Sequence, residues 1–149
     1  MLDLFRRLFS YDGWAIERSL SSIDASRRSE AALLLSHILL AEKIWLTRLR
    51  GEGSSHIPTF EDLPLDECEK MANELHRGYR EFIDSLNDAD LNRTTTYKNT
   101  RGEEFSTPVR EVLMHVGLHG AYHRGQIAWL VREGGGTAVS TDYITFTRL

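Results

Sequence analysis

The chain has 149 residues, which is long enough to bury a sizeable core in one domain and leaves little length for a second. Hydrophobic residues make up 41% and charged residues 27% of the sequence, as in an ordinary soluble globular protein. The 18 basic and 22 acidic side chains give a net charge of -4, which argues against the strongly basic face of a nucleic-acid-binding domain.

The lone cysteine, Cys68, permits no disulfide within the chain and is typical of a reducing compartment. The opening segment, residues 1–14, is interrupted by acidic and basic residues. It therefore lacks the apolar stretch of a signal peptide or of a membrane span. We expect a cytoplasmic protein that does not enter a membrane.

Apolar residues recur at helical spacing in four long segments, of which the first covers about residues 2–24. The second begins at Ser29, or at a neighbouring Ser or Arg, and runs to about Arg50, where Gly51 ends it. The side chains predicted to face inward from the first segment are Leu4, Leu8, Tyr11, Ala15 and Ile23. Those predicted to face inward from the second are Leu34, Ile38, Ala41, Ile44 and Trp45.

A third helix is expected to begin near Asp66, with Glu69 placed to complete a capping box. Its predicted inward side chains are Met71, Leu75, Tyr79, Phe82 and Leu86. The fourth helix is expected to have Thr107 as its N-cap and to end at Gly134.

The connections are predicted from turn residues. Residues 51–64 form a loop rich in Gly, Ser and Pro, and residues 94–106 are expected to form a short hairpin. The last residues, TDYITFTRL, are expected to be extended. The sequence thus predicts an all-α four-helix bundle with a short β-hairpin between the third and fourth helices, built as a single domain over residues 1–149.

The fourth predicted helix contains His115, His119 and His123, spaced by four residues so that they share one helix face. Relative to the apolar residues of that helix, His119 and His123 fall inside the buried arc, and His115 falls at its edge. Two imidazoles one turn apart on such a face can bind the same metal ion. A third ligand is expected from a facing helix, and His37 lies on the apolar side of the second helix.

A purely structural explanation competes with metal binding. A lone histidine on an apolar face, such as His37, is more often a buried neutral side chain with one hydrogen bond. Burying three imidazoles in one bundle is costly, however, because each brings a donor and an acceptor that must be satisfied. Spacing alone leaves both explanations open.

Five segments of the chain carry a resemblance to known proteins, and the most specific is HGAYHRGQI, residues 119–127. The others are LFSYDGW, SHILLAEKIWLTRL (residues 36–49), TYKNTRGEEFSTPVREVLMHV (residues 96–116) and DYITF (residues 142–146). Together they make nearly the whole chain similar to the DinB/YfiT-like superfamily of bacterial four-helix bundles. The resemblance implies one divalent metal ion, zinc or nickel, on His37, His119 and His123, and it also implies a homodimer.

Three histidine ligands leave at least one coordination position open, as in catalytic metal sites. Some members of the superfamily transfer low-molecular-weight thiols to electrophiles, so the resemblance implies a metal-dependent thiol transferase with a small-molecule substrate. A hydrolase that uses metal-bound water is the other enzymatic hypothesis. The non-catalytic alternative is a stress-related homodimeric bundle whose metal is structural or sensory, and it is favoured by the lack of an evident general base.

Residues near the histidine motif also have predicted roles. Arg124 is expected at the surface or in a salt bridge, and Gln126 is expected to hydrogen-bond a ligand imidazole or another helix. Gly120 and Gly125 are expected to allow a neighbouring helix to approach closely. Weaker candidates for the mouth of the site are Glu42, Asp142 and Tyr143, and the expected packing anchors are Trp14, Trp45 and Trp129.

Overall fold

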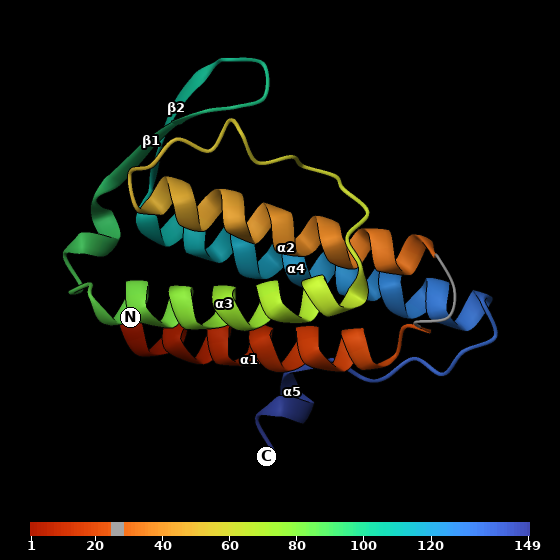
Figure 1. The fold of residues 1–149 in the computed structure, drawn as a ribbon. Helices are drawn as coiled ribbons and strands as arrows, with labels where there is room; N and C mark the ends of the chain where they lie inside the picture. Colours follow the sequence, from red (N-terminus) through yellow and green to blue (C-terminus); the bar gives the residue numbers. More distant parts are fainter. Residues whose placement is uncertain (25–28) are drawn as a thin grey trace.

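The computed structural model describes residues 1–24 and 29–149, and it contains four long helices and a two-stranded antiparallel sheet. The helices pack in two layers, with α2 beside α4 and α1 beside α3 (Figure 1). Their bounds are α1 Leu2–Ser21, α2 Glu30–Leu49, α3 Leu65–Asp84 and α4 Val109–Glu133. The predicted four-helix bundle with a hairpin between its third and fourth helices is therefore confirmed.

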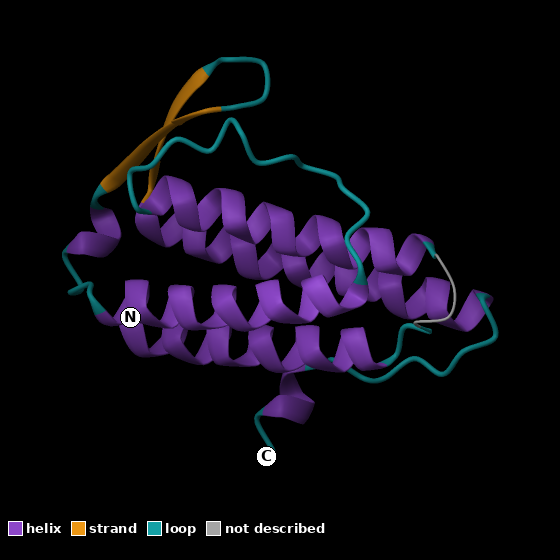
Figure 2. Cartoon of the chain, in the orientation of Figure 1, coloured by secondary structure: helices purple, strands orange, loops and turns teal. Residues whose placement is uncertain are grey.

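The hairpin and the loop that joins α2 to α3 lie on the same side of the bundle, over the layer formed by α2 and α4 (Figure 2). A short 3-10 helix, Asp90–Asn92, leads from α3 into strand β1, Thr94–Lys98, which pairs with β2, Glu104–Pro108. The left-handed backbone of Gly102, with a φ of 81°, makes the turn between the strands. The hairpin thus places polar and aromatic side chains above α2.

The N-terminus of α2 begins where the sequence predicted it. Ser29 is the N-cap, and its side-chain oxygen accepts a hydrogen bond from the backbone N–H of Ala32. The alternative starting points at the serine and arginines just before it fall in residues 25–28, outside the described residues.

The ends of two other helices differ from the prediction. Helix α3 begins at Leu65 after Pro64 and has no side-chain cap, so the capping box of Asp66 and Glu69 is wrong. Thr107 belongs to β2, where it pairs with Thr95, and is therefore unable to cap α4. At the start of α4, pairing in the hairpin therefore replaces the predicted cap. The other end of α4 is at Gly134, as predicted.

Most of the side chains predicted to face inward from the first segment do so: Tyr11, Ala15 and Ile23 are buried, and Leu8 packs against the core. Leu4 is 54% exposed, and the core is filled by Phe5, Phe9 and Ile16. Large aromatic side chains gain much free energy from burial, which favours Phe5 and Phe9 in the core over Leu4. Phe9 stacks on Tyr79 of α3 with ring centroids 4.4 Å apart, a contact that only the assembled bundle provides.

The C-terminal segment forms a short helix, α5, Tyr143–Phe146, where an extended tail was predicted. Its aromatic side chains pack on Tyr11 of α1, with ring centroids 5.1 Å away for Tyr143 and 5.8 Å away for Phe146.

Trp129, expected to anchor the packing, is exposed on α4 instead. None of the helices that the structure describes has the length and apolar character needed to cross a membrane.

Candidate metal centre

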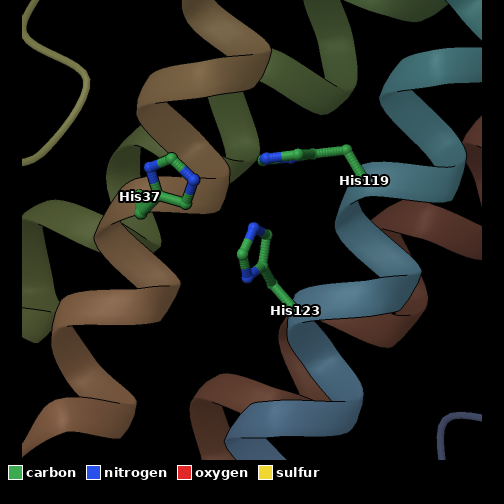
Figure 3. A group of neighbouring side chains, drawn as sticks. All are labelled: His37, His119 and His123. Atoms are coloured by element: carbon green, nitrogen blue, oxygen red, sulfur yellow. The ribbon is translucent and has the colours of Figure 1, made fainter.

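Three histidines from two helices converge between α2 and α4 (Figure 3). His37 comes from α2, and His119 and His123 come from α4. One ring nitrogen from each lies within 4.8 Å of the corresponding nitrogens of the other two. The ring centroids are 5.1 Å apart for His37 and His119, 4.8 Å for His37 and His123, and 4.5 Å for His119 and His123. The three side chains selected from the sequence are therefore neighbours.

Helix geometry explains this convergence. A separation of four residues places His119 and His123 one above the other on α4, and that face of α4 packs against α2. His37 is half-buried on the facing side of α2, between the fully buried Ser36 and Ile38. Each ring is accordingly held at the border between the core and solvent, where an ion would remain reachable from outside.

Hydrogen bonds orient two of the rings. Nδ1 of His37 is 2.7 Å from the carbonyl oxygen of Thr59, and Nδ1 of His123 is 2.6 Å from Oε1 of Gln126. Both partners accept hydrogen bonds, so in each ring Nδ1 carries the proton and Nε2 keeps its lone pair. This is the tautomer that a metal ligand with an oriented ring requires. The hydrogen bond from a histidine to Gln126 was one of the two alternatives predicted.

The protonation of the rings also suits a metal. Burial, together with repulsion from the neighbouring His123, His37 and His115, lowers the pKa of His119 to about 4. Burial also lowers the pKa of His37, although its hydrogen bond to Thr59 opposes this. A lowered pKa favours the neutral imidazole, which has a free lone pair for a metal, and a set of three imidazoles fits a divalent ion such as zinc or nickel with a position left open. That these residues bind an ion remains a prediction.

Two aromatic contacts complete the surroundings of the histidines. Phe60 stacks flat on His37 with ring centroids 4.0 Å apart and an interplanar angle of 6°. His115 contacts His119 on one side and Trp45 on the other, at 5.7 and 5.2 Å between centroids. The role of Phe60 was missed in the sequence, where the only signal was an aromatic residue in a polar loop. His115 does lie at the edge of the histidine group, as its helical phase predicted.

Arg124, next to His123 in the chain, points into the core and forms an ion pair with Asp12 of α1, with Nη1 2.5 Å from Oδ1. The expected salt bridge is thus confirmed, and the alternative of a surface position is wrong.

Glu42, expected near the mouth of the site, is buried beside the ion pair of Arg124 and Asp12. Burial raises the pKa of Glu42 well above its ordinary value, and Asp12 raises it further through its charge and a hydrogen bond. Glu42 therefore holds its proton.

The glycines of the motif have different surroundings. A Cβ on Gly120 would lie 2.8 Å from Nη1 of Arg124 and 3.0 Å from Oδ1 of Asp12, so this glycine leaves room for the buried ion pair. A Cβ on Gly125 would meet nothing within 4 Å. The predicted close approach of a neighbouring helix is therefore wrong for Gly125, and at Gly120 the space is occupied by the ion pair.

Tyr143, another residue expected at the mouth of the site, packs on α1 instead.

Comparisons with known proteins agree with the family resemblance and with the fold. The family model described as the DinB family matches residues 17–149. Protein DinB of Bacillus subtilis (strain 168) is 26% identical over 160 residues, which cover 96% of this chain and 93% of that protein. The crystal structure of a DinB-like protein from Bacillus cereus ATCC 10987 has the same fold, with a TM-score of 0.70 and 19% identity over 91% of this chain and 94% of that one. On the extent of these matches, the chain belongs to the DinB family.

Proposed function

We propose that this protein is a divalent-metal-dependent enzyme in which His37, His119 and His123 hold one zinc or nickel ion. The observation that carries the proposal is the convergence of three half-buried imidazoles from two helices. When bound, such an ion acts as a Lewis acid that stabilises the anionic form of a coordinated thiol or water at neutral pH. The residues of the chain would hold the ion, orient its ligands and leave one side open to a substrate.

Among the enzymatic reactions, we propose transfer of a low-molecular-weight thiol to an electrophile ahead of hydrolysis. In the described part of the chain, the group of potential metal ligands contains no carboxylate. Glu42, a carboxyl group near this region of α2, holds its proton in the core beside Asp12 and Arg124. Hydrolysis usually requires a general base within reach of water, whereas a thiol has an ordinary pKa of about 8.5 and ionises more readily.

Metal content and turnover test the proposal together. Protein purified without a histidine tag is expected to contain about one ion per chain by elemental analysis, and a His37→Ala variant is expected to lose most of it. His76→Ala is the matched control, because His76 is exposed on α3 and lies outside the histidine group. Turnover is measured with cysteine and 1-chloro-2,4-dinitrobenzene, and with p-nitrophenyl acetate for hydrolysis.

The outcomes separate the hypotheses. Thiol transfer that disappears with the metal supports the proposed reaction, and metal-dependent hydrolysis of the ester alone would replace it. If the protein holds its metal but turns over neither probe, a structural or sensory ion is favoured. A structural ion would lower the melting temperature when it is removed.

We further propose that the protein is a homodimer that pairs through the outward face of α4. Leu118, Tyr122 and Trp129 lie along this face and are 63%, 67% and 57% exposed. Apolar side chains that align on one helix face commonly mark an interaction surface, and a symmetric dimer would cover both copies of it at once. Tyr122 also contacts the ring of His123, so the interface would border the histidine group.

A cytoplasmic location is part of the same proposal. Cys68 is the lone cysteine of the sequence, and its thiol is buried and free. Burial raises the pKa of this thiol, as expected of a packing residue that is unreactive.

A further inference from the structure

A groove of about 860 Å³ lies between α2, the loop that follows it and the β-hairpin. Helix α2 contributes Ala41, Ile44, Trp45 and Arg48 to its wall, and strand β1 contributes Tyr97, whose ring contacts Trp45. Sites for small organic ligands usually measure about 300–1,000 Å³ and combine apolar walls with a few polar groups. The groove therefore has the size and character of a small-molecule site.

Two contacts connect this groove to the histidine group, although the three histidines do not line it. Thr59 is part of the groove wall, and its carbonyl oxygen is the hydrogen-bond partner of His37. Trp45, also in the wall, contacts His115, whose ring contacts His119 in turn. Two residues of the groove wall thus contact the histidine group or its neighbour His115.

The groove wall also holds an arginine, Arg48, that has no ion-pair partner among the described residues. The guanidinium of Arg48 lies 4.7 Å from the ring centroids of both Trp45 and Tyr97. Its Nε donates to Oγ of Ser54 and its Nη2 donates to the carbonyl oxygen of Lys98, while Nη1 has no hydrogen-bond partner among the described residues.

Carboxylates are present near Arg48 but do not pair with it. Glu52 and Glu104 belong to the groove wall, and neither forms an ion pair with Arg48 in residues 1–24 and 29–149. Burial lowers the pKa of Arg48, and Tyr97 opposes this effect. An arginine that is held rigidly by neutral partners, with one nitrogen free, is suited to bind an anionic group of a ligand.

We propose that the groove binds an elongated organic carboxylate, with its acid group on Arg48 and its apolar part against Trp45 and Ile44, as the substrate of the histidine site. The distance sets the length of this ligand. Arg48 follows His37 by about three turns of α2, which is about 16 Å along the helix. This inference rests on the proposed function only for the statement that the bound molecule is the substrate.

Binding of a matched pair of probes tests the inference without requiring turnover. 4-Biphenylacetate and its neutral amide, 4-biphenylacetamide, have the same shape and differ in charge. Each is titrated into the full chain, with and without zinc, while the three tryptophan indole signals are followed by NMR. We expect the acid to bind about tenfold more tightly than the amide and to shift the Trp45 signal, leaving those of Trp14 and Trp129 in place.

Two arginine variants supply the control. Arg48→Gln should abolish the preference for the acid, because the amide side chain has no charge. Arg18→Gln should retain it: Arg18 lies over Trp14 at 5.0 Å and donates to the carbonyl oxygen of Ser140, so it is a similar arginine–tryptophan pair outside the groove.

Equal binding of acid and amide to the unmodified protein would overturn the inference, even if Arg48→Gln failed to fold. A preference that survives in a folded Arg48→Gln variant, or a Trp45 signal that does not move, would also overturn it. Failure of the proposed function would give a different result: zinc would not bind the histidines, while the acid would still bind in the groove.

Discussion

Gln126 follows His123 by one turn of α4, and its Oε1 lies 2.6 Å from Nδ1 of that histidine. The amide nitrogen of Gln126 faces the other way, 3.5 Å from the hydroxyl of Tyr122. This arrangement fixes both the amide orientation and the ring tautomer, and it directs Nε2 of His123 towards the other two histidines. The ring is therefore positioned before any ion arrives.

Replacing Gln126 should weaken metal binding without removing a ligand. In Gln126→Leu the ring of His123 loses its acceptor, and zinc affinity is expected to fall about 10- to 100-fold. Gln126→Glu keeps an acceptor and should preserve the affinity. Both are measured by competition with a zinc-binding dye at fixed pH. Equal affinities for the two variants would show that the hydrogen bond has no part in positioning the ring.

The buried ion pair of Asp12 and Arg124 makes a separate prediction about stability. Arg124→Met leaves Asp12 buried without its partner, which is expected to destabilise the fold by about 3–5 kcal/mol in urea unfolding. Asp12→Leu combined with Arg124→Met should recover much of this loss, because no unpaired charge remains. Lys70→Met, which removes an exposed ion pair with Asp66, should leave the unfolding midpoint nearly unchanged. A double variant no more stable than the single one would contradict this explanation.

The proposed dimer predicts that charge on the outward face of α4 produces a monomer. Leu118→Glu is expected to shift the mass from light scattering to that of one chain at micromolar concentration, because the charge would be buried in the interface. Phe105→Glu, at an exposed apolar position on the hairpin, is the control and should remain dimeric. If the unmodified protein is a monomer at that concentration, the proposed dimer is contradicted.

The sequence predicted the histidine group because helical periodicity alone determines which face a residue occupies. His119 and His123 needed only their spacing, and His37 needed only its place in an apolar stripe. The residues around them depend on tertiary contacts instead. Phe60 reaches His37 from a loop, and Arg124 could enter the core only because Asp12 of another helix neutralises it there.

The same limit explains the errors in the fold. On α1, helical spacing selected Tyr11 and Ala15 correctly but missed Phe9, whose burial depends on its contact with Tyr79 of α3. At the start of α4, pairing of Thr107 with Thr95 replaces the predicted cap. Local signals therefore predicted which segments are helical, while the exact facing and the ends required the partner elements.

Two glycines of the histidine motif should respond in opposite ways to alanine. Gly125→Ala is expected to stabilise the protein by up to about 1 kcal/mol, because a Cβ there meets nothing and alanine favours the helix. Gly120→Ala should destabilise it, because the added methyl would press on Arg124 and Asp12 in the core. Thermal unfolding of both variants measures the difference, and a common sign for the two would refute the close packing at Gly120.

Glu42 predicts how stability changes with pH. Its pKa in the folded protein is raised well above the ordinary value of 4.5 by burial and by Asp12. Above about pH 4.5 the unfolded chain therefore releases a proton that the folded one keeps, and the stability contributed by this group falls as the pH rises, by at most about 1.4 kcal/mol per pH unit. Glu42→Gln removes the titration and keeps a donor for Asp12, so the variant should gain stability over the unmodified protein from pH 5 to pH 8. Glu74→Gln, exposed on α3, should show no such trend. If urea unfolding gave the Glu42→Gln variant and the unmodified protein the same pH dependence, Glu42 would be ionised in the fold, and the core would have to hold two carboxylates against one arginine.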